Sequence, residues 1–139
     1  MKTIAVLLGL LLSNFLTENT QSEKATITVT IENIQSAEGM VLASLHNNKT
    51  FLKGPGLKGM HFNARKGSLT FTFEDVEPGI YAISTMHDLN GNYRMDYTNE
   101  GIPLEPYAMS GVVDISGPPT FEHSKFQVTD QHIKLHLRF

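Results

Sequence analysis

Polar and apolar residues alternate in several short segments of this chain, with the period of two that half-buried strands show. The clearest case is residues 25–34, where Ile27, Val29 and Ile31 fall on one side and threonines fall on the other. The same reasoning predicts further strands at residues 40–46, 68–76, 80–86, 111–115, 125–128 and 133–139. No segment after residue 22 sustains a helical apolar period over three turns.

Turn-forming residues separate the predicted strands. Residues 36–39 and the sequence Glu77-Pro78-Gly79 have the chemistry of short turns. Residues 47–66 and 87–106 are polar and are predicted to be long connections. About seven short strands with turns between them predict an all-β fold with a single β-sandwich.

The N-terminal segment has the features of a secretory signal peptide. Lys2 is followed by an apolar run at residues 4–12, which is shorter than the roughly 20 residues that a membrane span needs. We expect cleavage between residues 13 and 22, with retention as a short anchor as the alternative. The predicted organisation is a signal peptide at 1–22 and a β-sandwich domain at 23–139, exported to the periplasm or the exterior, with no transmembrane span in the mature chain.

Composition narrows the class of protein further. The 139 residues are enough for one domain, and a formal net charge of -3 gives no electrostatic footprint for nucleic acid. The 40% hydrophobic and 18% charged residues are ordinary for a globular domain. The chain has no cysteine, which excludes disulfides, thiol catalysis and cysteine-ligated metals.

One polar segment concentrates hard oxygen ligands at alternate positions. If Asp88 is position 1 of a calcium loop, Asn90 and Asn92 fall at positions 3 and 5, and Asp96 falls at position 9. Arg94, at position 7, would contribute its backbone carbonyl. Carboxylate, amide and carbonyl oxygens suit Ca²⁺, so these residues are the candidate metal ligands.

The segment departs from the helix-flanked calcium loop in three ways. Tyr93 stands where glycine normally makes the sharp turn, and Asn99 occupies the closing position, with the candidate ligand Glu100 one residue late. The flanking segments are predicted to be strand and loop. The alternative is that Asp88, Asn90 and Asn92 only cap their own turns, as these residue types often do. The sequence leaves both possibilities open.

The chain also resembles a known family over nearly its whole length after residue 25. The resemblance rests on Pro-Gly-Ile-Tyr-Ala at 78–82, His-Asp-Leu-Asn-Gly-Asn at 87–92 and the segments 101–105, 107–110 and 117–122. It points to the domain of unknown function 2141 family of exported bacterial proteins, and more distantly to the calcium-stabilised B-type repeats of surface adhesins. The resemblance implies an immunoglobulin-like or transthyretin-like sandwich and supplies no activity.

The histidines give little sign of a metal site. His132 and His136 lie four residues apart in a predicted strand, where they would be about 13 Å from one another, so we expect surface histidines. His87, which precedes the polar segment, is expected to be structural. His46, His61 and His123 show no partner pattern.

The sequence favours a non-catalytic exported module whose polar segment is ordered by calcium and contacts an unknown protein or glycan partner. Three tyrosines near that segment could form an aromatic platform: Tyr93, Tyr97 and Tyr107. The alternatives are the same sandwich without an ion, or a carbohydrate-binding or hydrolytic protein. The hydrolytic alternative would draw on the four carboxylates of the region: Asp88, Asp96, Glu100 and Glu105. No known catalytic motif is present.

Overall fold

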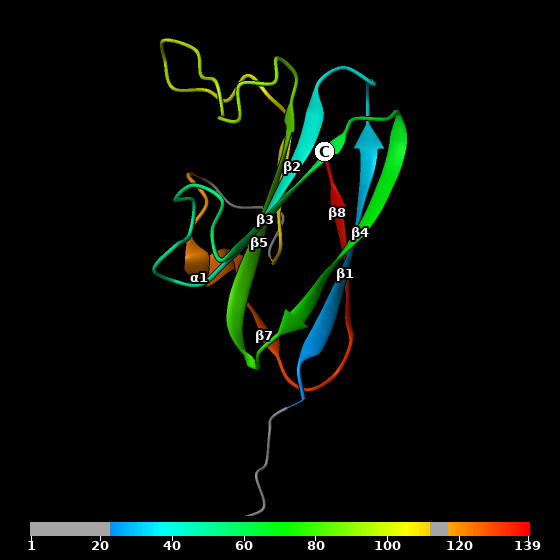
Figure 1. The fold of residues 1–139 in the computed structure, drawn as a ribbon. Helices are drawn as coiled ribbons and strands as arrows, with labels where there is room; N and C mark the ends of the chain where they lie inside the picture. Colours follow the sequence, from blue (N-terminus) through cyan, green and yellow to red (C-terminus); the bar gives the residue numbers. More distant parts are fainter. Residues whose placement is uncertain (1–22, 112–116) are drawn as a thin grey trace, which may run out of the picture.

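The computed structural model describes residues 23–111 and 117–139 and shows an all-β chain folded into two sheets (Figure 1). The first sheet has three strands, in the order β4 (Gly67–Val76), β1 (Ala25–Ile34) and β8 (Ile133–Arg138). β1 pairs antiparallel with β4 and parallel with β8. The first and last described strands therefore lie side by side.

The second sheet is built around the longest of its strands, β5. Its order is β3 (Lys58–Asn63), β2 (Met40–His46), β5 (Gly79–Asp88) and β6 (Tyr107–Met109). β7 (Phe126–Val128) pairs with the first residues of β5, whereas β6 pairs with its later residues. A single helical turn, α1 (Phe121–Ser124), precedes β7 and is capped by the Thr120 hydroxyl, which accepts a hydrogen bond from the His123 amide.

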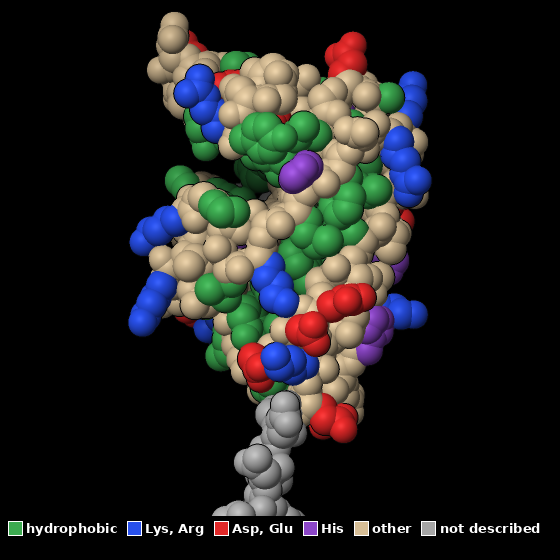
Figure 2. All heavy atoms as spheres, viewed as in Figure 1, with side chains coloured by type: hydrophobic (Ala, Val, Ile, Leu, Met, Phe, Trp, Pro, Cys, Tyr) green, Lys and Arg blue, Asp and Glu red, His purple; other side chains and the backbone are tan. Residues whose placement is uncertain are grey.

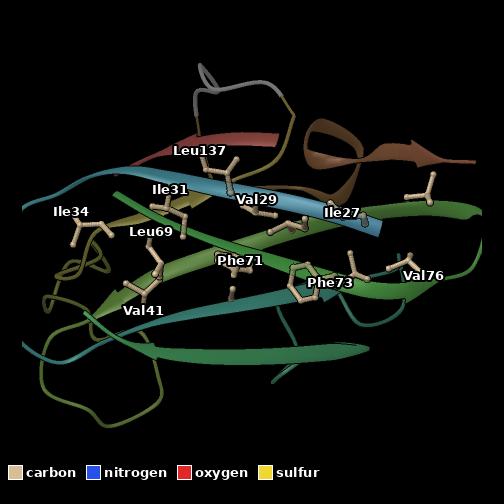
Figure 3. Close-up of a cluster of buried hydrophobic side chains, with 14 of the residues drawn as sticks. Ile27, Val29, Ile31, Ile34, Val41, Leu69, Phe71, Phe73, Val76 and Leu137 are labelled. Atoms are coloured by element: carbon tan, nitrogen blue, oxygen red, sulfur yellow. The ribbon is translucent and has the colours of Figure 1, made fainter. Parts of the chain in front are cut away.

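The core lies between the two sheets, as the alternation in the sequence predicts. Ile27, Val29 and Ile31 of β1 are fully buried and face side chains of the second sheet (Figure 3). Phe71 and Phe73 of β4 join them in an edge-to-face contact with ring centroids 5.6 Å apart. Each fully buried side chain of this size stabilises the fold by about 1.5–3 kcal/mol. The β-sandwich prediction is confirmed at this level.

Several strand predictions needed correction. The described residues contain eight strands, whereas about seven were expected. The segment 47–66 is not a plain connection, because β3 lies within it as an edge strand. His87 and Asp88 are the last residues of β5, and the long connection begins only after them. β6 was not predicted at all.

Two predictions fall largely or wholly on residues whose structure is not described. The signal peptide at 1–22 lies outside the described residues, and so does the predicted strand 111–115, apart from Gly111. Among the residues that the structure does describe, no helix has the length and hydropathy needed to cross a bilayer.

Candidate functional site

The candidate site lies in the connection from β5 to β6, residues 89–106, which we call the projecting loop. It extends beyond one end of the sandwich, at the upper left of Figure 1. The loop contains a short ribbon, residues 96–104, in which Tyr97 pairs with Pro103 as an isolated antiparallel bridge. The Leu104 amide donates to the Asp96 carbonyl at 2.8 Å at the base of the ribbon.

Asp88 organises the start of the projecting loop from the end of β5. Its side chain is fully buried, and three backbone N–H groups donate to its carboxylate. Oδ1 accepts from Gly91 at 2.8 Å and from Asn92 at 3.2 Å, and Oδ2 accepts from Tyr93 at 2.8 Å. Hydrogen bonds to an ionised acceptor are about twice as strong as neutral ones, so this buried charge is well compensated.

Tyr93 adopts the left-handed backbone conformation that the sequence pattern assigns to glycine. Its φ is +61°, which costs a residue with a side chain roughly 1–2 kcal/mol. Two contacts offset this cost. The Tyr93 amide reaches Asp88, and its ring lies edge-on against His61 of β3, with centroids 5.9 Å apart. The tight turn therefore forms without glycine at this position.

The two asparagines lie beside Asp96, two of the residues that the spacing singles out next to a third. The side-chain amides of Asn90 and Asn92 both donate to Oδ2 of Asp96, at 2.7 Å and 2.8 Å. The oxygen of Asn90 accepts from the Asn92 amide at 3.1 Å, and the oxygen of Asn92 accepts from the Arg94 amide at 3.0 Å. Each asparagine thus closes a small turn and also holds Asp96.

The other two candidate ligands lie further out. Arg94 is exposed over 77% of its side chain, and its Nε is 3.7 Å from Oδ1 of Asp96. Glu100 is exposed in the turn of the ribbon, where its amide donates to the Thr98 hydroxyl. Among the described residues, no group of three His, Asp or Glu side chains is placed to hold a metal ion.

The fit to a calcium ion depends on how the asparagine amides are turned. As arranged, their NH₂ groups point at Asp96 and their oxygens accept backbone N–H groups. A cation beside Asp96 would require both amides to rotate end for end, which exchanges oxygen for nitrogen and gives up these backbone bonds. The present arrangement satisfies the polar groups of the loop by hydrogen bonds within it.

Glu105, which the sequence suggests only as one of four carboxylates for the hydrolytic alternative, closes the loop in the structure. Glu105 is 5% exposed, and its two carboxylate oxygens accept from two separated amides, Leu89 at 3.0 Å and Asp96 at 3.2 Å. It therefore joins the beginning, middle and end of the projecting loop. No spacing rule signals such a contact. Its position just before Pro106 and β6 is the only local clue.

His87 holds the base of the loop, as expected of a structural residue. Its ring is buried, with Nε2 2.7 Å from the Glu38 carbonyl oxygen, and it stacks on the Phe139 ring at a centroid distance of 6.2 Å. Of the predicted surface histidines, His132 lies in an exposed contact with the Thr28 hydroxyl at 3.3 Å.

His46 is a buried residue whose partners could not be predicted from the sequence. Its Nδ1 lies 2.8 Å from the Thr50 carbonyl oxygen, so this nitrogen carries the proton and Nε2 accepts from the Ser84 hydroxyl at 2.9 Å. Burial lowers the pKa of His46, an effect that the Thr50 contact opposes in part. The ring fastens the turn after β2 to the outer face of β5.

The projecting loop also carries most of the exposed large hydrophobic residues of the described chain. Six of the nine exposed large hydrophobic residues belong to this loop or to the first residue of β6. They are Leu89, Tyr93, Tyr97, Ile102, Leu104 and Tyr107. Large apolar side chains gathered in one exposed segment mark an interaction surface more often than scattered ones do.

The chain matches a known protein family over most of its length. The pattern of a bacterial family described as "Uncharacterized protein conserved in bacteria (DUF2141)" matches residues 29–136. The chain belongs to this family. No curated protein and no solved structure matches the chain. The family assignment thus agrees with the resemblance seen in the sequence and adds no activity.

Proposed function

We propose that this protein is an exported, non-catalytic binding module that contacts its partner through the projecting loop. The observation that carries the proposal is the concentration of exposed apolar side chains in that loop. The sandwich, which we propose to be immunoglobulin-like or transthyretin-like, serves as a rigid base. Loops on a rigid base are a common location for binding residues.

The hydrogen bonds at the base of the loop support this role. Asp88 and Glu105 together accept five backbone N–H groups from the loop, and both side chains are buried. A loop held in this way has less conformational freedom to lose when a partner binds, which favours affinity. The same burial withdraws these two carboxylates from contact with a substrate, which favours a binding role over the hydrolytic alternative.

Site-specific crosslinking in the producing cell tests the binding role. A photoreactive amino acid at Leu104 should give adducts of defined mass, because this side chain is 59% exposed on the loop. Ile80 is the matched control, since it is 53% exposed but lies near the start of β5, whereas the loop follows the end of that strand. The proposal fails if both positions give the same adducts, or if neither gives any.

Export is part of the proposal and has its own test. The support is the short apolar run at residues 4–12 after Lys2. Mass spectrometry of the protein from its producing cells should find a new N-terminus between residues 14 and 23. A chain that keeps its first residues would contradict cleavage and favour the anchored alternative.

A calcium-ordered form of the loop is a second candidate. It is supported by the convergence of Asn90 and Asn92 on a single oxygen of Asp96, because amide rotation would replace two N–H donors with two oxygens. An ion that binds only the folded loop would stabilise it by about 2.7 kcal/mol at a hundredfold excess over Kd. Thermal melts in calcium and in excess chelator should then differ, and Asp96→Asn should remove the difference. Equal midpoints would contradict the calcium-ordered form and leave hydrogen bonds as the only interactions that order the loop.

A further inference from the structure

The ribbon of the projecting loop exposes apolar side chains on both of its faces. Tyr97 and Pro103 are paired across the ribbon, so their side chains share one face, and the flanking residues Ile102 and Leu104 fall on the other. Tyr97, Ile102 and Leu104 are 57%, 60% and 59% exposed. A flat surface would cover only one of these faces, so the occupant must enclose the ribbon.

The tip of the ribbon argues against a lipid surface as that occupant. Residues 99–101 form the turn and are all exposed, and they include the charged Glu100. Insertion of the ribbon into a bilayer would carry this carboxylate in ahead of the apolar flanks, which is costly. A protein surface can contact the flanks and leave the tip in water.

The exposed area fits one side of a protein–protein contact. If each of the six exposed apolar residues of the loop region has a full surface of about 200 Å², their exposed fractions sum to roughly 600 Å². A standard interface buries about 800 Å² on each partner, part of it polar. The apolar centre and a modest polar rim would together reach that size.

Two exposed charged side chains of the loop can pair with those of a second copy of the same loop. Arg94 and Glu100 are both exposed and of opposite sign. In a contact with twofold symmetry, a residue pair formed between the two copies occurs twice. Arg94 of each copy can therefore face Glu100 of the other. The molecule also has a place for the ribbon: Figure 2 shows a hollow with hydrophobic side chains at its floor, between the projecting loop and the connection after β2.

We infer that the projecting loop is a homodimerisation surface, in which the ribbon of each copy packs into the hollow beside the ribbon of the other. This inference rests on the proposed binding role and names a second copy of this chain as the partner. The reciprocal contact covers both faces of each ribbon and pairs the two exposed charges crosswise.

Sedimentation velocity of the protein, expressed from its full sequence, tests the inference over a range of concentrations. We expect a monomer–dimer equilibrium. Ile102→Asp should raise the dimer Kd at least tenfold, because it places a charge in the apolar centre of the contact. Ile80→Asp, at a similarly exposed residue near the start of β5 and away from the loop that follows its end, should leave Kd unchanged. Unchanged melting temperatures would show that both variants are folded.

A charge exchange distinguishes a twofold contact from other associations. Arg94→Glu and Glu100→Arg should each weaken the dimer, and the double variant should restore it, because the crosswise pairs are re-formed with reversed signs. A monomer at every concentration, or a dimer that Ile102→Asp leaves intact, would overturn the inference. If crosslinks at Leu104 still appear in cells while the purified protein is monomeric, the binding role stands and the partner is another molecule.

Discussion

The buried carboxylate of Asp88 offers the sharpest test of how the projecting loop is held. In Asp88→Asn, the remaining oxygen can keep the Gly91 and Asn92 bonds, but an NH₂ group then faces the Tyr93 amide. The loss of a charge-assisted bond and the facing donors should destabilise the loop by about 3 kcal/mol. This corresponds to roughly a hundredfold change in the equilibrium between closed and open loop.

Amide hydrogen exchange measures this change where it occurs. The Gly91, Asn92 and Tyr93 amides should exchange about a hundredfold faster in Asp88→Asn than in the wild type, whereas core amides of β1 should change less. Asp130→Asn is the matched control, because Asp130 is exposed and should shift stability by no more than about 0.5 kcal/mol. Equal exchange rates in the wild type and Asp88→Asn would refute the role given to this carboxylate.

Three further predictions concern the base of the loop and the sheet beneath it. Burial lowers the pKa of His46 in the folded protein below its ordinary value of 6.5. As pH drops below 6.5, the unfolded chain therefore binds more protons than the folded one, and the free energy of unfolding should fall. His46→Gln should reduce this pH dependence in urea titrations. Gly39→Ala places a Cβ 2.0 Å from the Asp88 carbonyl oxygen and should cost at least about 3 kcal/mol by chemical denaturation. Ser110→Ala should cost about 2 kcal/mol by the same assay, because its buried hydroxyl accepts from the Ile83 amide at 2.8 Å.

Each of these predictions has an internal comparison. Gly91 also has a positive φ, but a Cβ there meets nothing within 4 Å, so Gly91→Ala should cost only about 1 kcal/mol. If the two glycine variants are equally stable, the close approach of Asp88 to Gly39 does not decide the cost of the Gly39→Ala substitution. Ser36→Ala removes an exposed hydroxyl contact to the Glu38 amide and should be nearly neutral. If the free energy of unfolding depends on pH equally in His46→Gln and the wild type, His46 is not the cause of the lower stability in acid.

The strands that could be predicted are those whose alternation is strong and whose inner face is fully buried. β1 and β4 show this clearly, because one set of side chains fills the core and the other set is polar. β3 was missed since its inward residues, Met60 and Phe62, are only half-buried at a sheet edge and lie among glycine, lysine and histidine. β6 has three residues, too few for a period to be visible.

From the sequence, only the residues in the first part of the candidate site, up to Asp96, could be singled out. The alternate spacing singles out Asn90, Asn92 and Asp96, and the structure has the side-chain amides of both asparagines donating to Asp96. The spacing cannot tell whether such groups bind an ion or one another, since both uses need the same residues. The loop-closing role of Glu105 escapes prediction because its contacts are to backbone amides 16 and 9 residues away in the sequence.

The parallel pairing of β1 with β8 has a consequence for when the domain can form. β1, the first described strand to be synthesised, pairs with β8, the last one. The Asn33 side chain also donates to the Phe139 carbonyl, 106 residues further along the chain. Until residues 133–139 have left the ribosome, one edge of β1 has no neighbour and the core is open. Pairings between distant segments also form slowly. The core should therefore form only after residues 133–139 are available to pair with β1.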